Sequence, residues 1–322
     1  MFDAKPYIKE IARGRHGARD LTRSEARTLF SAVFAGEVPD AALGALLVAL
    51  RVKGESLEEL AGMMDALQPH TRPLDMPVRR AIPVILPSYS GSRKIANLVP
   101  LLAMMLAREE VPVLVHGVRQ EAARVGTFEI LEHLGHPRAE SVAEAEEHLE
   151  TRKLAVMPVG VLSPDLARVI DLRSVTGVRN SAHTLAKLML PNGVGPAAAC
   201  RMVPVTHPDF LKLMRDYFTA FPANAFVMRG VEGEAIVRLN APQPIEEMRS
   251  DGSTMSHLIG ESEANSLLPA REAEATARWT RDVLEGRAAV PLALARQAAL
   301  IVDHCRKAAN AGRPPLHLVS SK

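Results

Sequence analysis

The sequence predicts an α/β protein in which a small all-helical N-terminal lobe joins a larger, mostly parallel α/β lobe. Residues 1–72 show only the spacing of amphipathic helices, whereas from residue 82 onward short apolar runs alternate with helical segments. The 322 residues also exceed the size that one hydrophobic core usually serves. We expect 1–72 to form the helical lobe, 163–190 to fold back onto it, and 73–162 with 191–322 to form the α/β lobe.

Two capping boxes mark the helices of the first lobe. Thr22 with Glu25 and Ser56 with Glu59 each place a helix-capping hydroxyl three residues before a glutamate. Between these two helices lies a very apolar one, whose surplus of buried faces suggests a partner helix or a second subunit. The helices predicted for this lobe span 22–36, 40–54 and 56–67.

The rest of the chain follows the alternating pattern of a parallel α/β sheet. After the proline-rich linker 71–77, short apolar runs are separated by amphipathic segments of ten or so residues. Ligands of such sheets bind at the C-terminal ends of the strands. The predicted strands are 82–86, 111–115, 154–159, 202–205 and 225–228. The predicted helices are 97–107, 127–134, 208–218, 270–284 and 292–309.

Composition indicates a globular cytoplasmic protein. Hydrophobic residues make up 47% and charged residues 24%, no apolar run reaches the length of a membrane span, and the N-terminus is too polar for a signal peptide. Cys200 and Cys305 form no C-x-x-C pair and predict two free, buried thiols. The net charge is only +2, but cations concentrate in 1–27 and 168–187.

The loop LPSYSGSRK at 86–94 is the strongest candidate for an anion site. It leads from a buried strand into a predicted helix that Ser92 can cap, and it carries Arg93 and Lys94 without a carboxylate. Backbone N–H groups at a helix start, together with two cations, favour an anion. The alternative is a plain surface turn, since one glycine makes a poor cradle for a pyrophosphate.

Four motifs carry a resemblance to a known family. In chain order they are ALRVKGE at 49–55, VHGVR at 115–119, GTFEILEHLG at 126–135 and RSVTGVR at 173–179. The chain resembles the anthranilate phosphoribosyltransferases of glycosyltransferase family 3, which have a nucleoside phosphorylase-like fold. The resemblance implies a cleft between a helical lobe and an α/β lobe, and a homodimer formed through the helical lobe.

The chain departs from that family where the family does its chemistry. The enzymes hold pyrophosphate on a GTGGD loop, the sugar phosphate on KHGNR and a serine pair, and magnesium on an Asp-Glu pair. Here the loop reads SYSGS, Ala122 and Ala123 replace the serines, and Glu234 alone stands opposite the metal pair. Phosphoribosyl transfer needs charge on the leaving pyrophosphate neutralised. We therefore predict no catalytic residues and no metal or cofactor.

These departures resemble the YbiB-like branch of the family, which is similar to dimers that bind nucleic acid without sequence preference. The resemblance implies a basic groove for single-stranded DNA or RNA, with phosphates facing cations and Tyr89 stacking on a base. The alternative for Tyr89 is a surface tyrosine packed beside a proline, and for His116 a histidine satisfied by backbone. The predicted binding residues are Arg13, Arg15, Arg19, Tyr89, Ser90, Gly91, Arg93, Lys94, His116, Arg119, Arg124, Arg179 and Lys187.

Two other functions stay open. One alternative function is that of a divergent glycosyl or phosphoribosyl transferase that acts on phosphoribosyl diphosphate with Mg²⁺. It is also a candidate sensor of a small anionic metabolite that binds in the retained cleft. Turnover of phosphoribosyl diphosphate with anthranilate would identify the transferase. A rise in melting temperature with nucleotides would identify the sensor.

Overall fold

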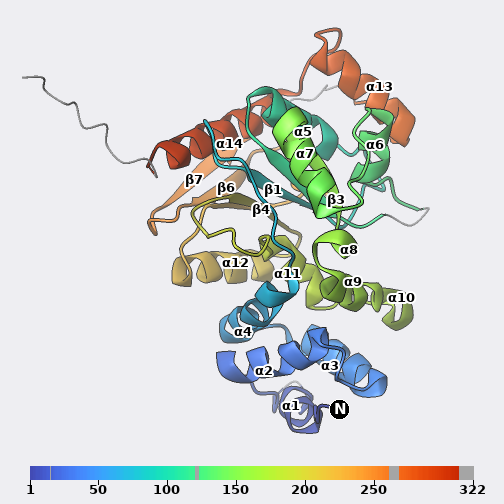
Figure 1. Ribbon diagram of the computed structural model, residues 1–322, viewed down its shortest axis with the longest axis vertical. Helices are drawn as coiled ribbons and strands as arrows, with labels where there is room; N and C mark the ends of the chain where they lie inside the picture. The colour runs from blue at the N-terminus through green and yellow to red at the C-terminus, as the bar shows by residue number, and fades with distance from the viewer. Residues whose placement is uncertain (15, 120–122, 261–267, 312–322) are drawn as a thin grey trace, which may run out of the picture.

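The computed structural model describes residues 1–14, 16–119, 123–260 and 268–311 (Figure 1). Within them one sheet of seven strands runs in the order β3-β2-β1-β4-β5-β6-β7. The strands from β3 to β5 in this order are parallel to one another, while β6 pairs antiparallel with β5 and β7 pairs antiparallel with β6. The strands are β1 (Val84–Ser88), β2 (Val113–Gly117), β3 (Leu154–Pro158), β4 (Cys200–Val205), β5 (Ala225–Arg229), β6 (Gln243–Met248) and β7 (Thr254–Ile259).

The mostly parallel α/β lobe is thus confirmed, and its five parallel strands lie within two residues of the predicted positions. The β6–β7 hairpin was not predicted. Its sequences, QPIEEM and TMSHLI, contain no continuous apolar run, because β7 is an edge strand whose side chains are mostly exposed. An antiparallel edge strand with one face in solvent has fewer consecutive apolar residues than a strand buried on both faces, so it is harder to predict from the sequence.

The helical lobe occupies one end of the molecule, drawn in blue in Figure 1, and α1 lies at its extremity. Both predicted capping boxes are present, on α2 and α4. The short helix α1 was missed because its apolar residues span fewer than two turns. The lobe consists of α1 (Lys5–Ile11), α2 (Arg23–Phe34), α3 (Asp40–Lys53), α4 (Leu57–Leu67) and the 3-10 turn η1 (Gln68–His70).

The remaining helices cover both faces of the sheet. On one face α5 and α14 contact each other, and on the other α11 and α12 contact β4 and reach α4. The insertion that carries α9 and α11 contacts α2 and α4 of the helical lobe. These helices are α5 (Val99–Arg108), α6 (Thr127–His133), α7 (Val142–Arg152), α8 (Val159–Leu162), α9 (Pro164–Asp171), α10 (Arg173–Thr176), α11 (Ala182–Leu188), α12 (Pro208–Ala220), α13 (Ala273–Leu284) and α14 (Leu292–Ala311).

Side chains alternate along the buried strands between two hydrophobic cores. On β1, Val84 and Leu86 join the core beneath α5 and α14, while Ile85 joins the core shared with the helical lobe. Both cysteines are free and buried, as predicted. Over the described residues, no helix combines the length and apolar character needed to cross a bilayer.

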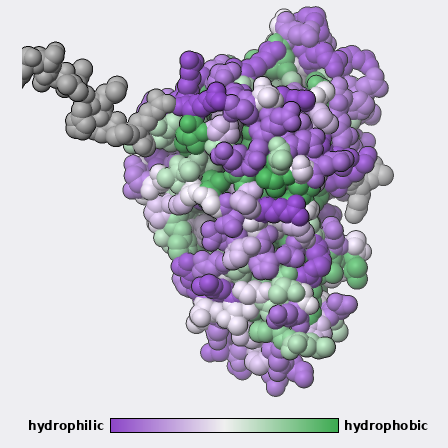
Figure 2. Space-filling view, in the orientation of Figure 1, coloured by the Kyte–Doolittle hydropathy of each residue, from purple (hydrophilic) through white to green (hydrophobic). Residues whose placement is uncertain are grey.

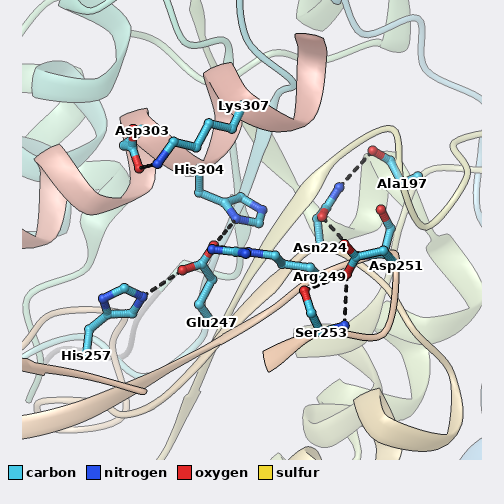
Figure 3. Close-up of polar contacts among 11 residues, drawn as sticks. Ala197, Asn224, Glu247, Arg249, Asp251, Ser253, His257, Asp303, His304 and Lys307 are labelled. Atoms are coloured by element: carbon cyan, nitrogen blue, oxygen red, sulfur yellow. Dashed lines mark hydrogen bonds and ion pairs between the residues drawn. The ribbon is translucent and has the colours of Figure 1, made fainter. Parts of the chain in front are cut away.

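A buried carboxylate ties α14 to the β6–β7 hairpin. Glu247 on β6 is 3% exposed and accepts hydrogen bonds from Arg249 Nε at 2.7 Å, His257 Nε2 at 2.6 Å and His304 Nδ1 at 2.8 Å (Figure 3). His304 lies on α14 and is itself 4% exposed. Because a buried charge is tolerated only when it is paired and hydrogen-bonded, this cluster fixes the helix on the sheet.

Candidate functional site

The loop that follows β1, residues 89–98, forms the floor of the candidate site. The helix α5 begins only at Val99, whose N–H donates to Asn97 Oδ1 at 3.1 Å. The prediction that Ser92 caps a longer helix is therefore wrong. The physical reason is Pro100: proline lacks an N–H and fits only the first turn, so the helix starts beside it.

Two carboxylates from the loop after β5 occupy the N–H groups of this floor. The N–H groups of Ser90 and Gly91 each donate to Glu234 Oε1 at 2.7 Å. The N–H groups of residues 93–94 donate to Glu232 Oε2 at 2.9 and 3.1 Å. The prediction that these N–H groups hold an external anion is wrong, because the chain supplies its own anions from about 140 residues further on.

Glu234 is held tightly in that position. It is 1% exposed, and burial raises the pKa of its carboxyl above the usual value, while the hydrogen bonds from the N–H groups of Gly91 and Ser90 oppose the shift. The preceding Gly233 has φ +91°, and a Cβ there would meet Ser90 Oγ at 2.6 Å. The close approach of the two loops keeps the glutamate on the floor.

The residues present do not fit the magnesium that the family resemblance implies for the transferases. Mg²⁺ requires near-octahedral oxygen ligation and usually takes one or two carboxylates with phosphate oxygens and water. Both carboxylates of this loop are already engaged, since Glu232 and Glu234 each commit one oxygen to backbone N–H groups of the floor, and Glu234 is 1% exposed. Across the part of the chain that the structure describes, no three His, Cys, Asp or Glu side chains are grouped to hold a metal ion.

Tyr89 and His116 form a buried pair behind the floor. Tyr89 is 3% exposed, its ring lies edge-on to the His116 ring, and its hydroxyl is 2.8 Å from His116 Nδ1. Burial lowers the pKa of His116 to about 3, so the imidazole stays neutral. The predictions that Tyr89 stacks on a base and that His116 contacts phosphate are wrong, since neither side chain reaches the surface.

Arginines flank the floor from the helical insertion and from the loop after β2. Arg124 Nη1 donates to the carbonyl oxygens of Ser90 and Gly91 at 3.1 and 3.2 Å. Arg179 Nη2 donates to Ser90 Oγ at 2.9 Å. The buried Ser90 and Gly91 thus position two predicted cations rather than bind a ligand through their own N–H groups.

Further cations gather around Arg179. Burial first, and then the charges of Arg173, Arg124 and Arg51, lower the pKa of Arg179, so these four guanidinium groups share one region. Lys187 Nζ donates to the Pro204 carbonyl at 2.6 Å, and burial and Arg179 lower its pKa to about 8. We call these five side chains the cleft cations: Arg51, Arg124, Arg173, Arg179 and Lys187.

The cleft cations make no direct ion pair with a carboxylate within the described residues. A carboxylate near them is Glu234 of the floor, whose charge opposes the lowering of the pKa of Arg179 and Lys187. Arg51 and Arg173 were absent from the predicted binding residues. The signal for them was present, since Arg51 lies in ALRVKGE and Arg173 opens RSVTGVR, two of the motifs that carry the family resemblance.

The other predicted cations lie apart from this cluster. Arg13 and Arg19 both pair with Glu10, at 2.6 and 2.5 Å, next to α1 at the end of the molecule remote from the sheet (Figure 1). They do not join the cleft cations, because the helical lobe separates α1 from the strand ends. Arg93, Lys94 and Arg119 are exposed on the outer side of the site. The predicted Arg15 lies outside the described residues.

A cavity of about 190 Å³ opens where the two lobes meet. Arg51 and Glu55 reach it from the end of α3 and the residues after it, and Arg179 and Lys187 from the insertion. Glu55 accepts a hydrogen bond from Ser181 Oγ at 2.6 Å, and burial raises the pKa of its carboxyl. The lining from the end of β4 and from α12 carries the apolar Val205, Phe210 and Met214 together with the polar Thr206 and His207.

Comparison with known proteins defines the class to which this architecture belongs. Residues 5–71 match the helical bundle domain of a glycosyl transferase family. The whole fold is similar to the crystal structure of anthranilate phosphoribosyltransferase from Thermus thermophilus, with a TM-score of 0.73 and 26% identity over 94% of this chain and 89% of that one. The Saccharomyces cerevisiae enzyme in complex with PRPP and Mg has a TM-score of 0.71 at 13% identity, covering 95% and 93%.

The chain belongs to the anthranilate phosphoribosyltransferase-like family, glycosyl transferase family 3. Within it, the uncharacterized protein YbiB of Escherichia coli (strain K12) is 39% identical over 299 residues, which cover 92% of this chain and 93% of YbiB. The family and the fold that the sequence motifs predicted are thereby confirmed.

Proposed function

We propose that this chain is a sequence-nonspecific nucleic-acid-binding protein on a phosphoribosyltransferase-like scaffold that no longer performs the transfer. One observation carries the proposal: the cleft cations, which make no direct ion pair within the described residues, converge beside a floor whose N–H groups are filled by Glu232 and Glu234. A site arranged in this way offers fixed positive charge to a polyanion. It offers no open cradle to a pyrophosphate.

The chemistry of the cleft cations suits the sugar-phosphate backbone. Phosphates occur at regular intervals on every strand, and contacts to them release counterions while carrying no sequence information. Guanidinium groups are the preferred partners of phosphate because they present several donors in one plane. DNA and RNA both satisfy this chemistry, so either serves as partner, and we place the protein in the cytoplasm as the sequence suggested.

The alternative is a divergent phosphoribosyl transferase that uses phosphoribosyl diphosphate and Mg²⁺. It is favoured by the fold and by the retained Arg179, but the donor set around Glu234 does not suit the metal. The choice can be made with wild-type protein. We expect random oligonucleotides to bind with a dissociation constant of roughly 10⁻⁶ to 10⁻⁴ M at physiological salt, measured by fluorescence anisotropy. We expect no product from phosphoribosyl diphosphate, Mg²⁺ and anthranilate.

Turnover in that assay that is lost in Arg179→Ala would establish the transferase and overturn the proposal. Absence of both turnover and oligonucleotide binding would leave the anionic-metabolite sensor as the function to pursue. A nucleotide or sugar phosphate would then raise the melting temperature of the wild-type protein by mass action.

We further propose that two copies of the chain associate through α3. The outer face of this helix carries an unbroken apolar stripe with helical spacing, and Val48 and Val52 on it are 41% and 82% exposed. Figure 2 shows hydrophobic colour over this part of the lobe. A second copy would bury the stripe and double the number of cleft cations on one particle, which raises avidity for a long strand. The stripe consists of Ala41, Ala45, Val48 and Val52.

Replacing Val48 and Val52 with aspartate is expected to convert a dimer into a monomer, because two charges would be buried against the partner helix. Light scattering coupled to size-exclusion chromatography measures the mass directly. Val78→Asp is the control, since Val78 follows the linker directly and is 51% exposed. A monomeric wild-type protein, or an unchanged mass in the double variant, would refute the α3 interface.

A further inference from the structure

The cavity between the lobes has two chemically different walls. One wall is cationic and comes from α3, the residues after α10, and α11. The other, which we call the apolar wall for Val205, Phe210 and Met214, comes from the end of β4 and from α12 and also includes Thr206 and His207. A phosphate alone would use only the first wall. A ligand that uses both must join an anion to a flat or compact apolar group.

The cationic wall holds its charge in fixed positions. Arg179 is anchored by Ser90 Oγ at 2.9 Å and Lys187 by the Pro204 carbonyl at 2.6 Å, while Arg51 makes no ion pair within the described residues. Glu55 is the one carboxylate that lines the cavity among the residues that the structure describes, and it is hydrogen-bonded to Ser181. The charge that faces the cavity is therefore positive on balance, with three cations against one carboxylate among the described lining residues.

The apolar wall presents an aromatic ring beside aliphatic packing. Phe210 on α12 is half-buried, whereas Met214, one turn further along the same helix, is 1% exposed and Val205 is 4% exposed. Phe210 therefore rests on a rigid support and still borders the cavity. Since Tyr89 is buried, Phe210 provides the phenyl ring that lines this cavity among the described residues.

The volume of the cavity limits what it can hold. At about 190 Å³ it is smaller than the roughly 300 to 1,000 Å³ of pockets that enclose drug-sized ligands. One planar base fits this description, whereas a base pair does not. A base inside a duplex cannot enter unless it leaves the stack, which costs a few kcal/mol that a single strand does not require.

We propose that this cavity takes one unstacked nucleotide of a single strand, with the base against Phe210 and its phosphate on Arg51 and Arg179, so that the protein prefers single strands over duplexes. The inference rests on the proposed nucleic-acid binding and specifies the strand form. It is compatible with absence of sequence preference, because every base has a π-face and stacking on an aromatic side chain tolerates all four.

The test compares Phe210→Ala with the wild type on a labelled single-stranded oligonucleotide and on the duplex of the same sequence. Loss of one base stack is expected to weaken single-strand binding about tenfold and to leave duplex binding within about twofold. Phe221→Ala is the matched control, because Phe221 follows the same helix, is also half-buried, and packs on Tyr217 away from the cavity. Phe210→Trp should retain single-strand binding.

A second measurement distinguishes binding in the cavity from binding to the cleft cations in general. Adenosine 5′-monophosphate is expected to raise the melting temperature of the wild type more than ribose 5-phosphate does, and Phe210→Ala should abolish that difference. Equal weakening of single-strand and duplex binding, the same loss in Phe221→Ala, or equal shifts with the two phosphates would each overturn the nucleotide pocket. Failure of the wild type to bind any oligonucleotide would refute the proposed function. The comparison of adenosine 5′-monophosphate with ribose 5-phosphate would still show whether the cavity binds a nucleotide.

Discussion

Changing Arg51 and Arg173 to glutamate is expected to weaken binding to single-stranded oligonucleotides by more than about tenfold at roughly 0.1 M salt. Both side chains belong to the cleft cations, and the double variant replaces two attractive charges with two repulsive ones. Neither side chain makes a hydrogen bond or ion pair within the described residues, so the fold should survive. Anisotropy titration measures the dissociation constant, and circular dichroism checks the fold.

The matched control is the double variant Arg13→Glu and Arg19→Glu. It changes the net charge of the protein by the same amount, but at the end of the helical lobe that is remote from the strand ends (Figure 1). Because salt screens exposed charges beyond about 8 to 10 Å, affinity should fall only slightly there. Equal losses in the two double variants would mean that overall charge, and not the cleft, determines binding.

Glu247→Gln is expected to lower the free energy of unfolding by about 3 kcal/mol near pH 6, measured by urea denaturation. The change leaves His304 buried and positively charged beside a neutral amide, and it removes the acceptor shared with Arg249 and His257 (Figure 3). Glu274→Gln is the control, because the Glu274–Arg278 pair is exposed on α13 and such pairs contribute at most about 1 kcal/mol.

The size of that loss should depend on pH. For His304, burial lowers the pKa, but the charges of Cys200 and Glu247 outweigh it and raise the pKa to about 10 from 6.5. Cys200 carries a charge because burial, which raises the pKa of its thiol, is outweighed by Cys305 and His304, which lower that pKa to about 6. Its stabilising contribution is complete below pH 6.5 and disappears as pH rises toward 10. For Glu247, burial opposes but three hydrogen-bond donors lower the pKa, so its contribution is present above pH 4.5 and is lost in acid. A difference between wild type and variant that stays constant from pH 6.5 to 10 would contradict this account.

The sequence predicted the parts of the fold that depend on local signals. Capping boxes at Thr22 and Ser56 and continuous apolar runs predicted the helices of the first lobe and the five parallel strands. The β6–β7 hairpin escaped because an edge strand needs no continuous apolar run. The start of α5 was misplaced because Ser92 has the chemistry of a cap, while Pro100 controls where the helix can begin.

The site could be predicted only in part, because its main feature joins distant segments. The loop at 86–94 was identified, but nothing in it reveals that Glu232 and Glu234 fill its N–H groups. Tyr89 was expected to be exposed because a tyrosine in a loop is usually exposed. His116 was expected to be exposed because it follows an apolar run. Their mutual hydrogen bond, which lets both be buried, requires β1 and β2 to be adjacent.

The dependence of wild-type binding on salt tests the central claim most directly. If five cleft cations face phosphates of a single strand, the logarithm of the binding constant should fall with the logarithm of salt concentration with a slope of about −3 or steeper. The variant with glutamate at 51 and 173 should give a shallower slope. A slope near zero for the wild type, at any affinity, would contradict the proposal that this scaffold holds a nucleic-acid backbone by fixed positive charge.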